Sequence, residues 1–247
     1  MESRLKRLRS RIEQWTPGLP LPVLKIFVVS AVVLLLFRKY GTARSYDRLI
    51  RPALDLDPDI LLGNGSYGYL SLATVVLFCL LPLISARLLE GHRPADLGFV
   101  LGDWRKGLKW TGLFLAGMLP IVAAASFIPT FYQIYPLSKG AGQSAAAFAL
   151  YEILMLLYFL AWEFFFRGYM LFSLEKHIGK VAILVQMIPF ALLHGSKPLP
   201  EALASIFVGI LLGYFALATR TFLYCGLIHF LVAFSMDVAA LLQKSGL

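Results

Sequence analysis

The stretch from Leu157 to Gly168 constrains the fold most, because it puts a carboxylate and a guanidinium inside a run otherwise apolar enough to enter a membrane. Glu163 and Arg167 stand four residues apart, so a helix places them on one face, with the acid first, the favourable order for pairing. An ionisable side chain at the centre of a membrane helix costs about 2.5–3.5 kcal/mol on insertion scales. The two residues therefore form either a structural ion pair or part of a functional site.

The composition predicts an all-α, polytopic integral membrane protein. Of the 247 residues, 59% are hydrophobic and 15% are charged, and the mean hydropathy is +0.74, which is too apolar for an ordinary soluble domain. The net charge of +9 comes from basic residues between apolar segments, as in topology signals, and does not indicate nucleic-acid binding. Cys79 and Cys225 fall inside apolar runs, which favours packing over a disulfide or a metal pair.

The apolar runs predict about seven transmembrane helices, within a range of six to eight. The fifth run is short for a hydrocarbon core of about 30 Å, so its end is expected to face protein or a water-filled cavity. Residues 1–84 are expected to hold a basic N-terminal segment, the first helix, a polar loop and most of the second helix, and residues 85–247 the core. The expected spans are 22–37, 67–89, 108–128, 145–172, 180–194, 201–218 and 221–242.

The basic residues predict a cytoplasmic N-terminus, with residues 1–19 as a short interfacial segment. The connection between the second and third spans contains Arg87, Arg93, Arg105, Lys106 and Lys109, whereas the next connection contains only Lys139. The loop over residues 39–66 is also basic and does not fit this pattern. Its aspartates lack the ligand spacing of a calcium loop, so we interpret them as solvated. The compact architecture suggests the inner (plasma) membrane of a bacterium.

Three more polar residues lie in the later spans. His194 closes the fifth span, and His229 and Asp237 lie in the seventh. At about 1.5 Å per residue, Glu163, His194 and His229 lie roughly 18, 24 and 12 Å from helix ends that face the same side. The sequence therefore predicts that these three residues and Arg167 meet inside the membrane. The purely structural alternatives are a helix-capping role for His194 and a helix–helix hydrogen bond for His229.

This set of side chains suits hydrolysis by activated water. Glu163 would act as general base, Arg167 would fix it, and His194 and His229 would orient the water or stabilise an oxyanion. Two histidines and a carboxylate also form a known zinc set. No H-E-x-x-H pair puts two ligands on one helix, so zinc is not favoured and no cofactor is expected. No G-x-S-x-G elbow supports a serine hydrolase.

The order of motifs resembles the CPBP family of intramembrane proteases, which includes the CAAX prenyl endopeptidases and the bacterial Abi proteins. The resemblance is carried by Glu163-Phe164-Phe165-Phe166-Arg167-Gly168, then by Phe190 and His194, then by His229 in a last long helix. The segments 93–99 and 104–108 add to it, and the similarity covers roughly residues 85–242. It implies a protease core that cuts a membrane-associated peptide or protein near its C-terminus.

Two positions depart from the family pattern. The family typically has two adjacent glutamates, the first of which is usually given the water-activating role, and Trp162 stands there. The family's last motif places Asn or Asp four residues after the histidine, where this chain has Ala233. Asp237 offers a replacement, about 80° round the helix from His229. Either Glu163 is the base with Asp237 assisting, or turnover is lost. We favour the enzyme, because an inactive scaffold has no reason to keep such costly groups.

Two other classes of function stay open. Glu163, His194, His229 and Asp237 could form the proton relay of a transporter, although no paired inverted halves are evident. The chain could also be a non-catalytic membrane partner of another protein. Glu152, near the outer end of its span, is interpreted as an interfacial group. Trp162 and residues 164–166 are interpreted as packing and lipid-facing aromatics rather than as substrate contacts.

Overall fold

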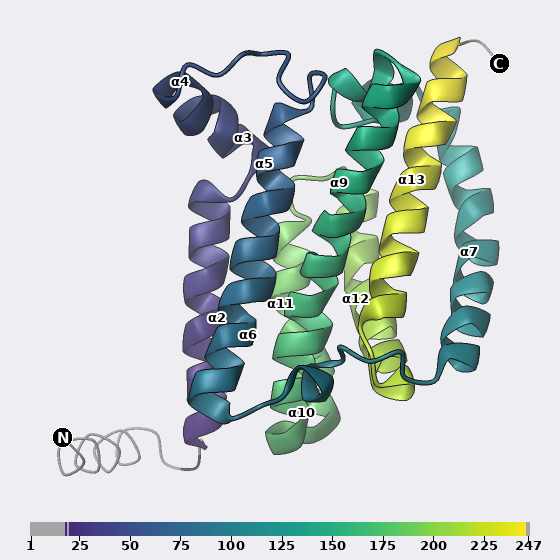
Figure 1. Ribbon diagram of the computed structural model, residues 1–247. Coiled ribbons are helices and arrows are strands. Elements are labelled where there is room, and N and C mark those ends of the chain that lie inside the picture. Colours follow the sequence, from purple (N-terminus) through teal and green to yellow (C-terminus); the bar gives the residue numbers. More distant parts are fainter. Residues whose placement is uncertain (1–17, 19, 246–247) are drawn as a thin grey trace.

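The computed structural model describes residue 18 and residues 20–245, so the interfacial segment expected over residues 1–19 lies outside the described residues, apart from Gly18. In this part of the chain the regular elements are all helices, and Figure 1 shows them aligned side by side in a bundle. The all-α polytopic fold class is therefore confirmed. Six helical segments are long and apolar enough to cross a membrane: Leu21–Tyr40, Gly65–Glu90, Trp104–Ser126, Ala145–Leu193, Leu199–Thr219 and Leu223–Ser245.

The first two spans are joined by the polar loop. Helix α2 (Leu21–Tyr40) leads into the short helices α3 (Ala43–Ser45), η1 (Tyr46–Ile50) and α4 (Arg51–Ala53). The loop is not solvated throughout, because Asn64 at its end is buried. The Asn64 amide donates to the carbonyl of Ala147 at 3.0 Å and accepts from the Ser138 hydroxyl. The loop is thereby tied to the start of α9 (Ala145–Glu163).

The second span contains widened turns around Pro82. It runs through α5 (Gly65–Thr74), the π-helical η2 (Val75–Leu80), α6 (Leu81–Ser85) and the π-helical η3 (Ala86–Glu90). Pro82 has no N–H to donate to the preceding turn, and such a loss is a common cause of local widening. The 3₁₀ turn η4 (Pro94–Leu97) then begins the connection to α7 (Trp104–Ser126).

The segment Ala145–Leu193 holds both the fourth and the fifth expected spans. It consists of α9, η6 (Phe164–Leu171), α10 (Phe172–Ile178), η7 (Gly179–Val181) and α11 (Ala182–Leu193). Gly179 has φ 59° and ψ −148°, a backbone conformation open almost only to glycine. The chain reverses there and α11 packs back against η6. With 12 residues, α11 is about 18 Å long and shorter than the membrane core.

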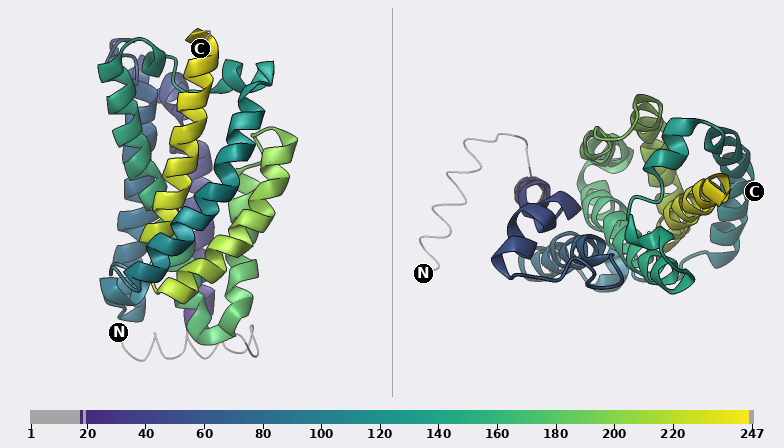
Figure 2. Two further views of the ribbon diagram at one scale, coloured as in Figure 1. Left: turned by 90° about the vertical axis from the view of Figure 1, so that its right-hand side faces the viewer. Right: turned by 90° about the horizontal axis from the view of Figure 1, so that it is seen from above.

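The last helices close the bundle. After α7 come α8 (Pro129–Ile134) and the 3₁₀ turn η5 (Gly140–Gly142), and after α11 come α12 (Leu199–Thr219) and α13 (Leu223–Ser245). Helix α13 packs against α7 and α9, and α12 against α11. Figure 2 shows α2 on one side of the bundle and α7 and α13 on the other. Glu163, His194 and His229 thus come from α9, the end of α11 and α13 respectively.

The aromatic residues expected to face lipid lie in the core instead. Phe164, Phe165 and Phe166 are 0% exposed and Trp162 is 4% exposed. Trp162 packs against Phe37, Phe78 and Phe190, among others. Packing was the right interpretation and lipid exposure was wrong. Phe78 of the second span packs on Trp162, Phe165 and Phe166, whereas Phe99 and Phe222 pack on Phe164. Cys79 and Cys225 are free thiols, as expected.

Candidate active site

Glu163 is the centre of a buried polar group at the end of α9. Its Oε1 accepts a hydrogen bond from Nδ1 of His229 at 2.8 Å. Its Oε2 lies 2.8 Å from Nη1 of Arg167, one helical turn further along, and both side chains are 0% exposed. The latter contact pairs the charges without aligning an N–H with the oxygen. Both oxygens of Glu163 are therefore occupied by protein groups.

Arg167 is held by contacts other than its ion pair. The guanidinium carbon lies 4.2 Å from the centre of the Phe190 ring, within the range of a cation–π interaction. Nη2 donates a long hydrogen bond of 3.4 Å to the carbonyl of Gly209 on α12. Arg167 thus links α9 and η6 to α11 and α12, and its charge balances that of Glu163 in a dry setting.

His229 is held in one tautomer by Glu163. A carboxylate only accepts hydrogen bonds, so Nδ1 of His229 carries the proton of the 2.8 Å contact. In the neutral ring Nε2 is then a free acceptor. The ring is tilted on that of Phe159, with centroids 4.3 Å apart. The His229 side chain is 21% exposed, whereas Glu163 is enclosed.

His194 is oriented in the same way by a backbone group. Nδ1 donates to the carbonyl of Phe190, 2.8 Å away on the preceding turn of α11. This is the helix-capping contact considered from the sequence, yet it leaves Nε2 free. The rings of His194 and His229 lie nearly parallel, 18° apart in orientation, with centroids separated by 6.1 Å. Two imidazoles with free Nε2 atoms therefore stand side by side.

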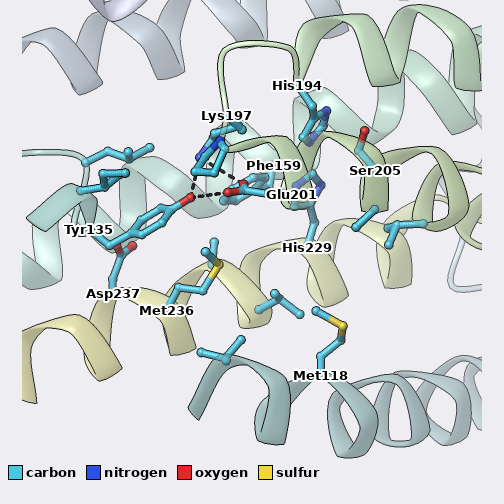
Figure 3. Close-up of a pocket in the computed structure, with 18 of the residues that line it drawn as sticks. Met118, Tyr135, Phe159, His194, Lys197, Glu201, Ser205, His229, Met236 and Asp237 are labelled. Atoms are coloured by element: carbon cyan, nitrogen blue, oxygen red, sulfur yellow. Dashed lines mark hydrogen bonds and ion pairs between the residues drawn. The ribbon is translucent and has the colours of Figure 1, made fainter. Parts of the chain in front are cut away.

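Both histidines line a large cavity between α7, α9, α11, α12 and α13, shown in Figure 3. Its volume is about 640 Å³ and its wall is mainly aliphatic and aromatic, a size and character typical of ligand sites. Glu163 and Arg167 are not among its lining residues. The groups that can touch a ligand at this end thus include the imidazoles, Phe159, Phe190 and Trp162, but not the carboxylate. Trp162 was interpreted from the sequence as a packing residue rather than a substrate contact, and its place in the cavity lining differs from that interpretation.

Asp237 lies in the same cavity but apart from this group. It stands eight residues beyond His229 on α13 (237 minus 229), which is about 12 Å along the axis. In the part of the chain that is described, no hydrogen bond joins it to Glu163 or His229. Figure 3 shows it beside Tyr135, away from the two histidines. Among the described residues, no direct contact therefore supports the expectation that Asp237 assists Glu163.

The expectation that Glu152 is an interfacial group is also corrected. It is only 7% exposed and so belongs to the protein interior rather than to the membrane interface. Helix α13 covers this face of α9. Oε1 of Glu152 is buried and accepts no hydrogen bond from the described residues.

A polar cluster at the cavity was missed from the sequence. Lys197 donates to the Tyr135 hydroxyl at 2.9 Å and pairs with Glu201 at 3.4 Å, and the hydroxyl donates to Glu201 at 2.9 Å. Dashed lines in Figure 3 mark these contacts. The only signal in the sequence was the spacing of four between Lys197 and Glu201. Tyr135, in a separate connection, could not be assigned to them.

A metal centre has few donors in this arrangement. Over residues 20–245, no group of three or more His, Cys, Asp or Glu side chains is arranged to hold a metal ion. The zinc set considered from the sequence needed Glu163 as a ligand, but both its oxygens contact His229 and Arg167. The two free Nε2 atoms are the donors that a metal ion would find here.

Comparison with known proteins gives one family. Residues 143–235 match a family model described as type II CAAX prenyl endopeptidase Rce1-like. No curated protein and no solved structure matches the chain. The match confirms the resemblance to the CAAX and CPBP proteases that the motifs indicated. The matched segment includes Glu163, Arg167, His194 and His229 and ends before Asp237.

Proposed function

We propose, starting from the match of residues 143–235 to the CAAX prenyl endopeptidases, that this protein is an intramembrane endopeptidase. It hydrolyses a membrane-associated peptide or protein near the substrate's C-terminus. The observation that supports this most is the Glu163–His229 hydrogen bond of 2.8 Å, which leaves the second nitrogen of the imidazole free at the wall of an apolar cavity.

The general base in this proposal is His229. A buried carboxylate that accepts from Nδ1 holds the ring in one tautomer and stabilises the imidazolium once Nε2 takes a proton. Glu163 is 0% exposed and does not line the cavity, so it acts through His229 rather than on water. This revises the role expected from the sequence, where Glu163 was the base.

The water is held between the two imidazoles. One water that donates to both Nε2 atoms can bridge nitrogens up to about 5.6 Å apart, twice a usual hydrogen-bond length. His194 and His229 both line the cavity, with ring centroids 6.1 Å apart, and in this proposal their Nε2 atoms hold such a water. The oxygen of this water keeps its lone pairs for attack on a peptide carbonyl that enters the apolar cavity.

His229 alone can carry out both proton transfers of the reaction. His229 takes a proton from the water as the C–O bond forms, and it returns the proton to the amide nitrogen as the C–N bond breaks. Arg167 compensates the charge of Glu163 throughout. The chain therefore uses a carboxylate–histidine pair where Trp162 replaces the first glutamate of the family motif.

Cleavage of a peptide panel by purified protein in detergent tests the proposal. The panel contains prenylated and unprenylated membrane peptides, and new termini are identified by mass spectrometry. General base catalysis contributes about 10²–10⁴-fold, so His229→Ala should lose at least about 100-fold. His177→Ala is the matched control, because His177 is exposed and outside the cavity. Equal cleavage by His229→Ala and wild type would refute the role of His229.

A chelator arm separates water activation by histidine from metal catalysis. Cleavage by the wild type that persists with chelator supports the bridge between two imidazoles. Cleavage that stops with chelator and returns with added zinc would assign the two Nε2 atoms to a metal instead. If no version cleaves any peptide while all remain folded, a non-catalytic partner or a transporter becomes the better hypothesis.

The orientation in the membrane is a separate proposal. With a cytoplasmic N-terminus, as in a bacterial inner membrane, the end with Arg105 is inside and the end with Lys139 is outside. The cavity reaches the connections that contain Tyr135 and Lys197, so it would open outward. Arg105→Cys and Lys139→Cys, made with Cys79→Ala, test this in intact cells. Labelling of position 105 but not 139 by an impermeant maleimide would reverse the orientation.

A further inference from the structure

Asp237 is a buried carboxylate at the wall of the cavity and has no hydrogen-bond partner among the described residues. It is 3% exposed, and its Oδ1 accepts no hydrogen bond from the part of the chain that the structure describes. It is one of the residues that line the cavity, on the same helix as His229 (Figure 3). An isolated charge in a low-dielectric setting is costly unless it is paired. The carboxylate is therefore a position where a ligand can supply what the protein does not.

A second carboxylate reinforces this position. Glu152 is a second buried acid, on α9, the helix that packs against α13. Its Oε1 is likewise buried and accepts no hydrogen bond from the described residues. Asp237 lines the cavity and Glu152 does not, but two acids on packed helices favour a cation over an anion at this position.

The nearby lysines are engaged elsewhere. The Lys197 ammonium contacts Glu201 and the Tyr135 hydroxyl, and the Lys244 ammonium donates to the Tyr135 carbonyl at 2.8 Å. Neither ammonium forms an ion pair with Asp237 among the described residues. Glu201 is neutralised in this way, whereas Asp237 is not.

The distance between Asp237 and His229 along α13 sets how many residues of a bound peptide would separate the two sites. The separation of about 12 Å along α13 equals the span of three to four residues of extended peptide, at about 3.3 Å each. A peptide bound along the cavity with one bond at His229 thus brings a side chain three or four residues away to Asp237.

We propose that Asp237, supported by Glu152, is a specificity subsite for one lysine or arginine of the substrate, three or four residues from the bond that is cut. The proposal rests on the proposed protease function. The incoming ammonium or guanidinium donates to the Asp237 oxygens and so removes the cost of an unpaired buried charge. The apolar remainder of the cavity holds the aliphatic stem of that side chain.

Binding of paired peptides tests the subsite. The probes are fluorescent, otherwise apolar membrane peptides with a single lysine moved along the chain, each matched by the same peptide with norleucine. At one position, lysine should bind the wild-type protein about 10-fold more tightly, the scale of one charged hydrogen bond. Asp237→Asn should remove this preference and leave the norleucine peptide unchanged. Glu175→Gln is the control, because this carboxylate is paired with Arg220 and lies outside the cavity lining.

The outcomes separate the subsite from the protease proposal. Lysine and norleucine peptides that bind the wild type equally at every position would overturn the subsite, whether or not they are cut. A preference that survives Asp237→Asn would overturn it as well. A preference that disappears with Asp237→Asn supports the subsite even where no peptide is cleaved, and in that case only the protease function fails. If Asp237→Asn does not fold, the comparison of lysine and norleucine peptides on the wild-type protein still tests the subsite.

Discussion

Buried carboxylates near the two ends of the cavity differ in whether other protein groups compensate their charge. At one end, Glu163 contacts both Arg167 and His229, and none of its charge is left uncompensated. At the other end, Asp237 and Glu152 are almost as deeply buried but lack partners among the described residues. Both ends lie between α9 and α13, so the helix packing alone does not account for the difference.

The Glu163–His229 pair is preorganised before a ligand binds, whereas the Asp237 carboxylate gains a partner only when a ligand binds. A pair that is complete before the ligand arrives fixes the tautomer and position of His229 at no cost during reaction. A carboxylate without a partner is unfavourable in the empty cavity and gains most when a cation binds. Substitutions at the two ends are therefore expected to have different and partly opposite consequences.

The largest expected contrast concerns cleavage. His229→Ala should reduce turnover about 10²–10⁴-fold through loss of the base. Asp237→Ala should change the rate less than about threefold, within roughly 0.7 kcal/mol of barrier, on a substrate without a basic residue. Single-turnover assays with excess enzyme measure both. An equal loss in the two variants would return Asp237 to the chemical step and remove the contrast.

The next contrast concerns stability. Arg167→Met leaves the Glu163 charge buried without its cation and should lower the free energy of unfolding by about 3–5 kcal/mol. Asp237→Asn removes an unpaired buried charge and should leave stability unchanged or raise it. Unfolding in mixed micelles monitored by circular dichroism measures both. The double variant Glu163→Gln with Arg167→Met should recover most of the loss, and a double variant as unstable as Arg167→Met would contradict the ion-pair explanation.

A smaller effect is expected at the partly exposed pair of Lys197 and Glu201. Their side chains are 27% and 32% exposed, and such pairs contribute about 0–1 kcal/mol. Glu201→Gln should therefore lower the free energy of unfolding by less than about 1 kcal/mol. A loss as large as that of Arg167→Met would mean that the cavity mouth is as rigid as the Glu163 end.

The smallest effect is expected outside the cavity, at His92. Burial, and then the charge of Lys176, lower the pKa of the His92 imidazole, and Lys176 Nζ lies 3.4 Å from its Nε2. Between this lowered pKa and the unfolded value of about 6.5, the unfolded chain binds more protons. Stability should therefore fall as the pH drops below about 6.5 and level off below the folded pKa.

Melting temperatures at pH 7.5 and 5.5 measure this dependence. His92→Gln should show a smaller drop between the two pH values than the wild type. Cleavage by His92→Gln should match that of the wild type, because His92 lies outside the cavity lining. An unchanged pH dependence of the melting temperature would assign it to another group.

The spacing of polar residues along apolar runs predicted much of the Glu163 end. Glu163 and Arg167 share a helix face by their separation of four, and the depth estimate brought His194 and His229 to the same level. The structure then joins Glu163 to His229 at 2.8 Å. Depth along a helix was sufficient because a membrane holds helix axes nearly parallel.

Depth along a helix was not sufficient to predict the surroundings of Glu152 and Asp237. Glu152 was expected at the interface because of its position along α9, but the face covered by α13 decides its burial. Asp237 was assigned to Glu163 by sequence proximity to His229, although eight helical residues separate the two sites. Trp162 and Phe164 were expected to contact lipid, yet Phe37 and Phe78 pack on Trp162, and Phe99 and Phe222 pack on Phe164. Rotation about each helix axis sets these contacts, and hydropathy does not encode it.

The amino-acid sequence by itself determined the fold class, the apolar spans and the set of costly polar residues, because hydropathy and helical periodicity are local properties of the chain. Only the tertiary structure decided that Glu163 is closed off behind His229, that His194 presents a second free nitrogen, and that Asp237 has no partner among the described residues. Each of these depends on which helix faces which, and therefore on the packing of side chains far apart in the sequence.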